Sequence, residues 1–297
     1  RGIKGGCTIE GDRTPGEASG RRVTSVFENP TLAPADVAVT PRVLAFDIET
    51  DPRSERLLAI SLYGEGDAAA DEVLIVDAGN RAMPAGATRC ADEAEALDRF
   101  CARLAALDPD VLTGWNTIDF DFSTLAQIAA RVRHPFELGR DRGALRLRKA
   151  EGYFGSGQAS IPGRLVLDGI DLLRGAFVRM DDYSLEAVAQ QVLGEGKAVA
   201  GDVRDRIDEI LCNYRDDLPA FALYARTDAR LAYQIVAKLN LVELAFARSA
   251  LTGMTPDRVA ASIASFDFLY LTELERIGTV APTVRSSDAR VHEAQQG

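Results

Sequence analysis

The spacing of apolar side chains changes several times along this chain, and each change marks a predicted element. Residues 42–50 form an apolar run that ends in two acids, which predicts a buried strand. Residues 57–63 and 72–76 have the same strand-like character, and a break rich in glycine and acids separates them. The three segments therefore predict consecutive antiparallel strands, which amount to half a sheet.

Helical spacing begins after these strands. Residues 92–107 place apolar side chains on one side and end at Asp108, which predicts a helix. Residues 109–113 predict a short strand, and a second helix with one apolar side follows it. This succession of strands and helices predicts an α/β fold with a mixed sheet flanked by helices.

The second half of the chain predicts a hairpin and then more helices. Glycines lie between two alternating segments, residues 145–147 and 164–167, which predicts an inserted β-hairpin. A helix predicted from residue 185 ends at Gly194, and residues 203–250 are mostly helical in pattern. Residues 1–40 hold short strand-like pieces among glycines and prolines, too few to form a core of their own.

Composition narrows the classes of function. The 297 residues are 46% apolar, which is enough to bury a core, and no apolar run approaches membrane-spanning length. Four scattered cysteines and two histidines, His134 and His292, make no zinc set and favour a reducing cytoplasm. The net charge of -11 argues against general nucleic-acid affinity, although local charge can differ. Because residue 1 is Arg, we expect a fragment of a longer protein.

Two acids end the first strand of the predicted sheet. Side chains on a strand alternate between its faces, so Asp47 and Glu49 point the same way. Two carboxylates in an apolar place raise each other's pKa unless a cation joins them, and such oxygens suit Mg²⁺ or Mn²⁺. The alternative is that either acid only ends the strand in solvent.

Two further acids are candidate site residues because of their positions in the chain. Asp121 follows a strand at the predicted start of a helix, where the helix dipole alone also favours an acid. Asp228 lies four residues after Tyr224, a spacing that places the phenol beside the carboxylate on a helix. A solvated helix face with a half-buried tyrosine is the alternative for that pair.

The order of these pieces resembles a known family of nucleases. A strand with D-x-E, an N-x-x-x-F-D turn and a helical Y-x-x-x-D are similar to the three motifs of the DEDD 3'-5' exonucleases, which have a ribonuclease-H-like fold. Tyr224 indicates the tyrosine branch, since no histidine lies just ahead of Asp228. Residues 46–50 and 114–116 resemble the proofreading domains of family B DNA polymerases.

Longer stretches extend this resemblance, over nearly the whole chain, to the bacterial DNA polymerase II group of family B. They are residues 1–5, 138–141, 163–170, 185–189 and 193–197. The resemblance implies the end of a β-rich N-terminal domain (1–40), the exonuclease domain (41–251) and a connector into a polymerase module (252–297). The polymerase's own carboxylate motifs are absent, so we expect no DNA synthesis from this chain.

The resemblance also implies a role for each site residue. Two divalent ions, Mg²⁺ or Mn²⁺, would serve the attacking and leaving oxygens of phosphodiester hydrolysis. Asp47 would contact both ions, Glu49 and Asp228 the ion that activates water, and Asp121 the second ion. Tyr224 would orient the water, because a phenol with a pKa of about 10 is a poor base at neutral pH.

Substrate contacts are expected from two further groups of residues. Asn116 and Phe120 are candidates for holding the 3'-terminal nucleotide, with a turn asparagine and a core phenylalanine as the alternatives. A basic stretch leads into the predicted hairpin, and its charges could touch DNA phosphates or only form a solvated surface. Its members are Arg140, Arg142, Arg146, Arg148 and Lys149. In the family, a hairpin at this place helps to separate the primer end from the template.

Three functions remain as hypotheses. The first is a proofreading exonuclease that acts on single-stranded 3' ends of DNA, with a sliding clamp as a partner through the full-length protein. The second is an RNA-trimming enzyme of the same tyrosine branch. The resemblance of the motifs to family B DNA polymerases argues against it. The third is a non-catalytic DNA-binding or scaffolding module, against which the presence of all four acids and the tyrosine speaks.

Overall fold

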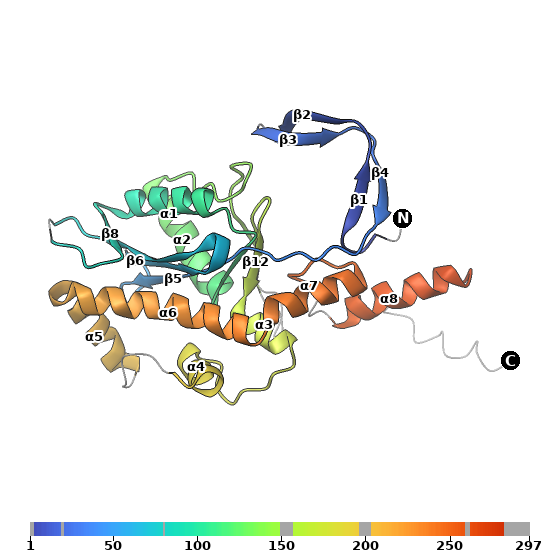
Figure 1. Ribbon diagram of the computed structural model, residues 1–297. Helices are drawn as coiled ribbons and strands as arrows, with labels where there is room; N and C mark the ends of the chain where they lie inside the picture. The colour runs from blue at the N-terminus through green and yellow to red at the C-terminus, as the bar shows by residue number, and fades with distance from the viewer. Residues whose placement is uncertain are drawn as a thin grey trace, which may run out of the picture.

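A six-stranded mixed sheet with helices on both faces is the centre of this protein (Figure 1). The computed structural model describes residues 3–18, 21–79, 81–148, 157–195, 203–258 and 262–281. The sheet has the strand order β12-β9-β5-β6-β7-β8. The strand bounds are β5 (Val43–Thr50), β6 (Leu57–Gly64), β7 (Ala70–Val76), β8 (Ala87–Cys90), β9 (Val111–Gly114) and β12 (Leu165–Asp168).

Strand direction divides this sheet into two parts. β5, β6 and β7 are antiparallel neighbours, which confirms the predicted meander. β9 runs parallel to β5, and β12 runs parallel to β9, so three strands end at the same edge. The mixed α/β class predicted from the pattern is thereby confirmed.

Helices form the layers above and below the sheet (Figure 1). One layer consists of α1 (Glu93–Leu107) and α2 (Ser123–Val132), which follows a π-helical turn, η2 (Thr117–Phe122). The other layer centres on α6 (Leu218–Lys238). The remaining helices are η1 (Gly66–Ala68), α3 (Gly169–Gly175), α4 (Leu185–Leu193), α5 (Val203–Asp216), α7 (Leu241–Thr252) and α8 (Ser262–Arg276).

The helix ends follow from local side-chain chemistry. The Asp92 carboxylate accepts a hydrogen bond from the backbone N–H of Glu95 and so caps α1. Ser184 caps α4 in the same way, and Gly194 ends that helix with a φ of 76°. A left-handed residue at a helix end favours glycine, so the predicted end of this helix is confirmed.

Alternation along β5 sends its apolar and acidic side chains to opposite faces. Leu44, Phe46 and Ile48 are buried in the core beneath α1 and α2. The Phe46 ring lies 5.4 Å from that of Phe100 and 4.7 Å from that of Phe122, measured between centroids. The intervening residues face α6, which packs against β5 and β6.

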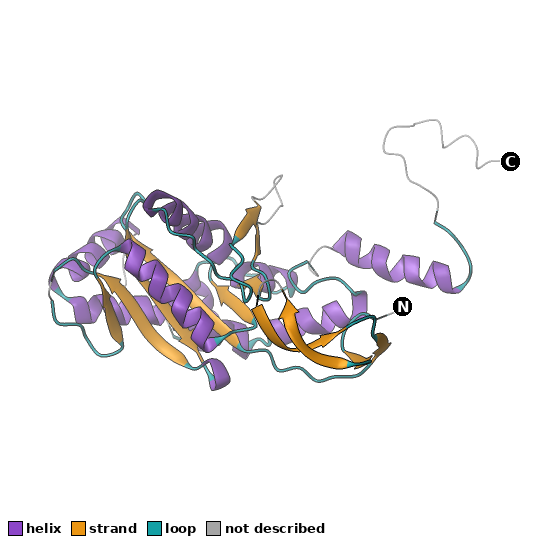
Figure 2. Cartoon of the chain, turned by 90° about the horizontal axis from the view of Figure 1, so that it is seen from above, coloured by secondary structure: helices purple, strands orange, loops and turns teal. Residues whose placement is uncertain are grey.

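The N-terminal strands form separate two-stranded sheets. β1 (Cys7–Glu10) pairs with β4 (Thr31–Pro34), and β2 (Arg13–Ala18) pairs with β3 (Arg21–Phe27). Figures 1 and 2 show these strands beside the main sheet rather than within it. Lys4 reaches the end of α7, where its ammonium donates to the backbone oxygen of Leu251.

The predicted hairpin exists, but its second arm was assigned to the wrong residues. β10 (Arg146–Arg148) pairs with β11 (Gln158–Ser160), whereas residues 165–168 form β12 of the main sheet. The physical reason is burial, because Val166 and Leu167 are 3% and 2% exposed and belong to the core. A short exposed hairpin would not bury such side chains.

Candidate active site

Three carboxylates meet at the end of β5. Asp47 and Glu49 come from the strand, and Asp228 comes from α6. Each offers one oxygen, and these three oxygens all lie within 4.8 Å of one another. Glu49 and Asp228 are buried, with 9% and 5% of their surface exposed. Asp47 and Glu49 therefore share one face of β5, as the strand alternation predicts, and Asp228 meets them on that face.

Helix α6 presents small side chains and the tyrosine of the predicted motif. Ala225, Ala229 and Ala232 are almost fully buried along this helix, which allows a close approach to the sheet. Tyr224 lies one helical turn before Asp228 and is only 7% exposed. Because both residues are buried, the alternative of a solvated helix face does not describe them.

Asp121, the fourth predicted acid, lies beside β5 in η2 but is not one of the three acids whose oxygens lie within 4.8 Å of one another. Its carboxylate oxygen accepts a hydrogen bond, 3.1 Å long, from the backbone N–H of Ile48, which lies between Asp47 and Glu49. β9 ends at Gly114 while β5 continues, so the side chain takes the place of a neighbouring strand. Burial raises the pKa of Asp121 well above its ordinary value, and the charge of Asp47 raises it further.

The turn after β9 depends on one glycine. A Cβ atom on Gly114 would lie 2.5 Å from the carbonyl oxygen of Phe46 and 3.1 Å from the side chain of Thr117. The backbone of the turn therefore passes closer to β5 than any other residue would allow. This close approach carries the chain directly from β9 into η2.

The two candidates for nucleotide contact lie on the surface of this turn. Asn116 has a φ of 63°, which asparagine tolerates, and its exposed side chain makes no capping hydrogen bond. Phe120 is 38% exposed, whereas its neighbour Phe122 is fully buried. The core alternative for Phe120 is therefore wrong, because Phe122 fills that role.

A groove beside the acids includes Phe120. It is lined by residues of β5, the loop after it, η2 and α5: Ile48, Glu49, Thr50, Asp51, Pro52, Ser54, Phe120, Ile207, Ile210 and Leu211. The lining combines apolar side chains, among them Phe120 and Leu211, with the carboxyl groups of Glu49 and Asp51. Such a lining suits a partly polar molecule.

The basic stretch divides between structural and exposed side chains. Arg140 forms ion pairs with Asp108 and Asp110, both 2.7 Å long, so its charge is engaged within the fold. Arg146 and Arg148 are both exposed on β10 and lie on the same side of that strand. Arg142 is also exposed, and Lys149 lies outside the described residues. β11 contacts η2, so the hairpin stands beside the turn that carries Asp121.

Sequence reasoning missed one buried acid near this site. Asp168 is 5% exposed at the end of β12, and its carboxylate accepts from the backbone N–H of Ile118 in η2. Burial is the main cause that raises its pKa to about 6, with the charge of Asp171 next. The available signal was an acid at a strand end directly before Gly-Ile-Asp, which is also typical of an ordinary helix cap.

The donor atoms of the acidic cluster fit a hard divalent cation. The three residues offer carboxylate oxygens alone, which are the ligands that Mg²⁺ and Mn²⁺ prefer. Burial raises the pKa of the Cys90 and Cys101 thiols to about 11 and about 12, which disfavours the thiolates that soft metals need. Within the described ranges, no helix combines the length and apolar character required to span a membrane.

Comparisons with known proteins match this chain to one family. The sequence model described as "DNA polymerase family B, exonuclease domain" matches residues 1–188. DNA polymerase II of Escherichia coli (strain K12) is 39% identical over 194 residues, which cover 65% of this chain and 25% of that protein. The DNA polymerase delta catalytic subunit of Schizosaccharomyces pombe is 31% identical over 230 residues, or 69% of this chain and 21% of that protein.

A third relative matches more of the chain at lower identity. The DNA polymerase of Archaeoglobus fulgidus is 24% identical over 288 residues, which cover 93% of this chain and 32% of that protein. The chain therefore spans a third or less of the length of each of these three relatives.

Proposed function

This chain belongs to the exonuclease-domain family of the family B DNA polymerases, and from that premise we propose that it removes nucleotides one at a time from the 3' end of single-stranded or frayed DNA. The observation that carries the proposal is the meeting of three carboxylate oxygens within 4.8 Å from β5 and α6. In a longer polymerase this activity would be proofreading. The names of the relatives support that reading, because each is a DNA polymerase.

The proposed reaction is hydrolysis of the last phosphodiester. A water oxygen attacks phosphorus, the bond from phosphorus to the 3' oxygen breaks, and that oxygen takes up a proton as the nucleoside monophosphate leaves. Asp47, Glu49 and Asp228 would hold divalent metal ions at this point, with Asp121 completing the set. When bound, two such ions would lower the pKa of the water and offset charge on both reacting oxygens.

The remaining residues orient the substrate in this proposal. The phenol of Tyr224, one turn before Asp228, would hydrogen-bond the attacking water without acting as a base. Phe120 would pack against the terminal base or sugar, which the exposed position of its ring in the groove supports. Asn116 would hydrogen-bond the same nucleotide, and its exposed side chain in the adjacent turn is compatible with that role.

The identity of the ions and the DNA path belong to the same proposal. We expect two ions, Mg²⁺ or Mn²⁺, because all the donors are carboxylate oxygens. Arg146 and Arg148 would contact DNA phosphates beside η2, with Arg142 and Lys149 as further candidates. Arg140 contributes less, because Asp108 and Asp110 already engage its guanidinium.

We propose the following division of the chain: residues 1–40 as the end of an N-terminal domain, 41–251 as the exonuclease domain, and 252–297 as a connector. The separate sheets of β1 to β4 support the first boundary, and the start of the main sheet at Val43 supports the second part. A sliding-clamp partner and a cytoplasmic location stay predictions. Co-purification of the clamp with the full-length polymerase would test the partner.

The experiment is degradation of a 5'-labelled single-stranded DNA by the full chain, with Mg²⁺ or Mn²⁺ and then with a chelator. An RNA of the same sequence is run beside it, and Asp47→Ala and Asp228→Ala proteins serve as inactive controls. We expect a ladder that shortens from the 3' end one nucleotide at a time, requires the metal and disappears in both variants.

Two outcomes would contradict the proposal. Shortening of the RNA but not of the DNA would favour the RNA-trimming enzyme. Tight DNA binding by the folded chain without any shortening, at enzyme in excess over DNA, would favour the non-catalytic module.

A further inference from the structure

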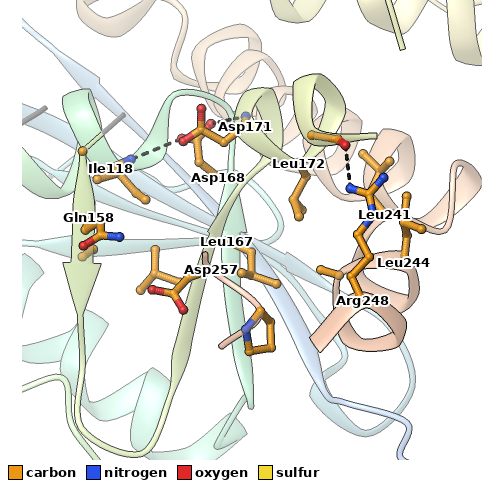
Figure 3. A pocket seen from close by; sticks show the side chains of 16 residues that line it. Ile118, Gln158, Leu167, Asp168, Asp171, Leu172, Leu241, Leu244, Arg248 and Asp257 are labelled. Atoms are coloured by element: carbon orange, nitrogen blue, oxygen red, sulfur yellow. Dashed lines mark hydrogen bonds between the residues drawn. The ribbon is translucent and has the colours of Figure 1, made fainter. Parts of the chain in front are cut away.

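One buried carboxylate joins two segments that lie fifty residues apart in the chain. Asp168 ends β12 and caps α3, where its Oδ1 accepts from the backbone N–H groups of Ile170 at 2.9 Å and Asp171 at 3.3 Å. Its Oδ2 accepts from the backbone N–H of Ile118 in η2, also at 3.3 Å. Figure 3 shows the carboxylate between these segments, at one end of a cavity that Ile118 and Asp171 also line.

The backbone around Asp168 packs closely against β9. The residue is paired with Gly114 across the parallel strands β12 and β9, and the Thr113 hydroxyl donates to the carbonyl oxygen of Leu167 at 2.7 Å. A Cβ atom on Gly169 would lie 2.7 Å from the carbonyl oxygen of Gly114 and 2.9 Å from the Trp115 ring. The position of Asp168 relative to the start of η2 is therefore fixed by close backbone contact.

The turn that Asp168 holds is the one that presents Asp121. Ile118 and Asp121 belong to the same six-residue π-helical turn, and Asp121 in turn accepts from Ile48 of the acidic strand. A π-helical turn is wider than a regular helical turn and is uncommon without a reason in packing or function. The hydrogen bonds thus form a chain from Asp168 through η2 to β5.

Helix capping alone does not explain why a carboxylate is buried at this position. Asp168 is among the charges that raise the pKa of Asp121, after burial and Asp47. A serine or asparagine would cap α3 without adding a buried charge there. Neither has two acceptor oxygens on opposite sides of one group, which the contacts to Ile118 and to α3 both require.

We propose that Asp168 is a positioning residue for the exonuclease site: it pins η2 to the end of β12 and so sets the position of the Asp121 carboxylate. The inference rests on the proposed function, because it concerns the carboxylate that completes the acidic set. Asp168 itself touches neither substrate nor metal in this scheme.

The test compares Asp168→Asn with Ser184→Ala in the full chain. The asparagine side chain would have the shape of the native one and would keep one acceptor for the cap of α3, but its amide nitrogen cannot accept from Ile118. Asp168→Ser is a second variant, which caps α3 but is too short to reach η2. Ser184→Ala removes the cap of α4, a different helix from the one that Asp168 caps.

The first readout needs neither metal nor activity. Amide hydrogen exchange measured by NMR on the metal-free protein should show protection of Ile118 and Ile48 falling about 5- to 10-fold in Asp168→Asn and Asp168→Ser. Ser184→Ala should leave both amides unchanged. The Ile48 amide is decisive, because only a shift of Asp121 would expose it.

The second readout is the split between kcat and KM on single-stranded DNA. We expect kcat to fall about 10-fold in both Asp168 variants, as for other residues that orient a metal ligand, with KM unchanged. Unchanged Ile48 protection, or a loss of kcat in Ser184→Ala as large as in Asp168→Asn, would overturn the inference. Absence of activity in the unmodified chain would count against the proposed function instead, while the exchange result would still decide the role of Asp168.

Discussion

The pKa values of carboxyl groups shift in opposite directions at the two ends of the central sheet. At the end where β9 and β12 begin, Asp108 and Asp110 lie among guanidinium groups, and the pKa of each is lowered. At the end where the same strands finish, the pKa of Asp121 and that of Asp168 are raised. Aspartates at the two ends of the same pair of strands therefore have opposite shifts in pKa.

The arginine-rich end is an ion-pair network that holds loops together. Arg42, Arg140 and Arg164 all contact Asp108, at distances of 2.7 to 3.0 Å. The side chain of Arg164 is only 3% exposed and also donates to the backbone oxygens of Leu104 and Pro109. Burial alone would raise the pKa of Asp108, but these arginines lower it. This end satisfies its acids within the protein, so its role is structural.

The acidic end gathers carboxylates whose mutual charge calls for a cation. Its acids come from β5, η2, β12 and α6, and burial penalises the ionised forms of Asp121 and Asp168. A divalent ion would relieve that cost in the way that guanidinium groups relieve it at the other end. The difference teaches that the groups facing the acids, rather than the number of acids, distinguish the two ends: arginines lower the pKa of Asp108 and Asp110, whereas burial and neighbouring carboxylates raise that of Asp121 and Asp168.

The largest expected effect is on catalysis at the acidic end. Asp121→Asn should lower kcat on single-stranded DNA by about 100-fold or more, because a neutral amide is a poor partner for a divalent ion. The melting temperature of the metal-free protein should not fall, since the change removes a buried charge beside Asp47. Asp110→Asn is the matched control and should keep its kcat. A clear loss of stability in Asp121→Asn would show that this end is structural as well.

The next effect is stabilisation of the acidic end by metal. Mn²⁺ at about 100 times its dissociation constant should add about 2.7 kcal/mol to the free energy of unfolding, because it binds the folded cluster. Thermal melts of the native chain with and without Mn²⁺ measure this gain, and a chelator should reverse it. The gain should disappear in Asp47→Asn and persist in Asp108→Asn. An equal gain in both variants would mean that the ion binds elsewhere.

The third effect breaks the arginine-rich end. Asp108→Asn should lower the free energy of unfolding by about 1–2 kcal/mol at pH 7, because buried Arg164 loses its carboxylate partner. The φ of 44° at this position is acceptable for asparagine, so backbone strain does not contribute.

The dependence of this third effect on pH has a defined sign. The pKa of Asp108 is lowered in the folded state, so its stabilising effect is full above the unfolded value of 3.8 and is lost as the pH falls through the lower folded value. Urea unfolding of both proteins should therefore give curves that converge in strong acid. Curves that stay apart at low pH would show that shape, rather than charge, explains the loss.

The smallest effect contrasts two arginines of the basic stretch. Arg148→Ala should raise KM for single-stranded DNA a few-fold and reduce the slope of log affinity against log salt by about 1, as for the loss of one phosphate contact. Arg140→Ala should instead lower stability, because Asp108 and Asp110 lose a partner. Equal salt slopes in the native chain and Arg148→Ala would remove the hairpin from the proposed DNA path.

Local pattern was enough for most of the elements and for the first pair of acids. The period-2 alternation of β5 fixes Asp47 and Glu49 on one face, and the spacing of Tyr224 and Asp228 fixes them one helical turn apart, because both relations depend only on backbone geometry. The ends of α1 and α4 follow from capping residues for the same reason. The resemblance to an exonuclease family also rests on these short-range relations.

Only the tertiary structure decided which distant residues meet. Three relations join residues that lie 50 or more positions apart in the chain. They are the pairing of β12 with β9, the hydrogen bond between Asp121 and Ile48, and the hydrogen bond between Asp168 and η2. The sequence pattern of residues 164–167 suits a hairpin arm and a sheet strand equally, and only burial separates the two. Likewise, Arg140 and Arg148 are the same residue type a few positions apart. Their different roles depend on Asp108 and Asp110, which only the folded chain brings to Arg140.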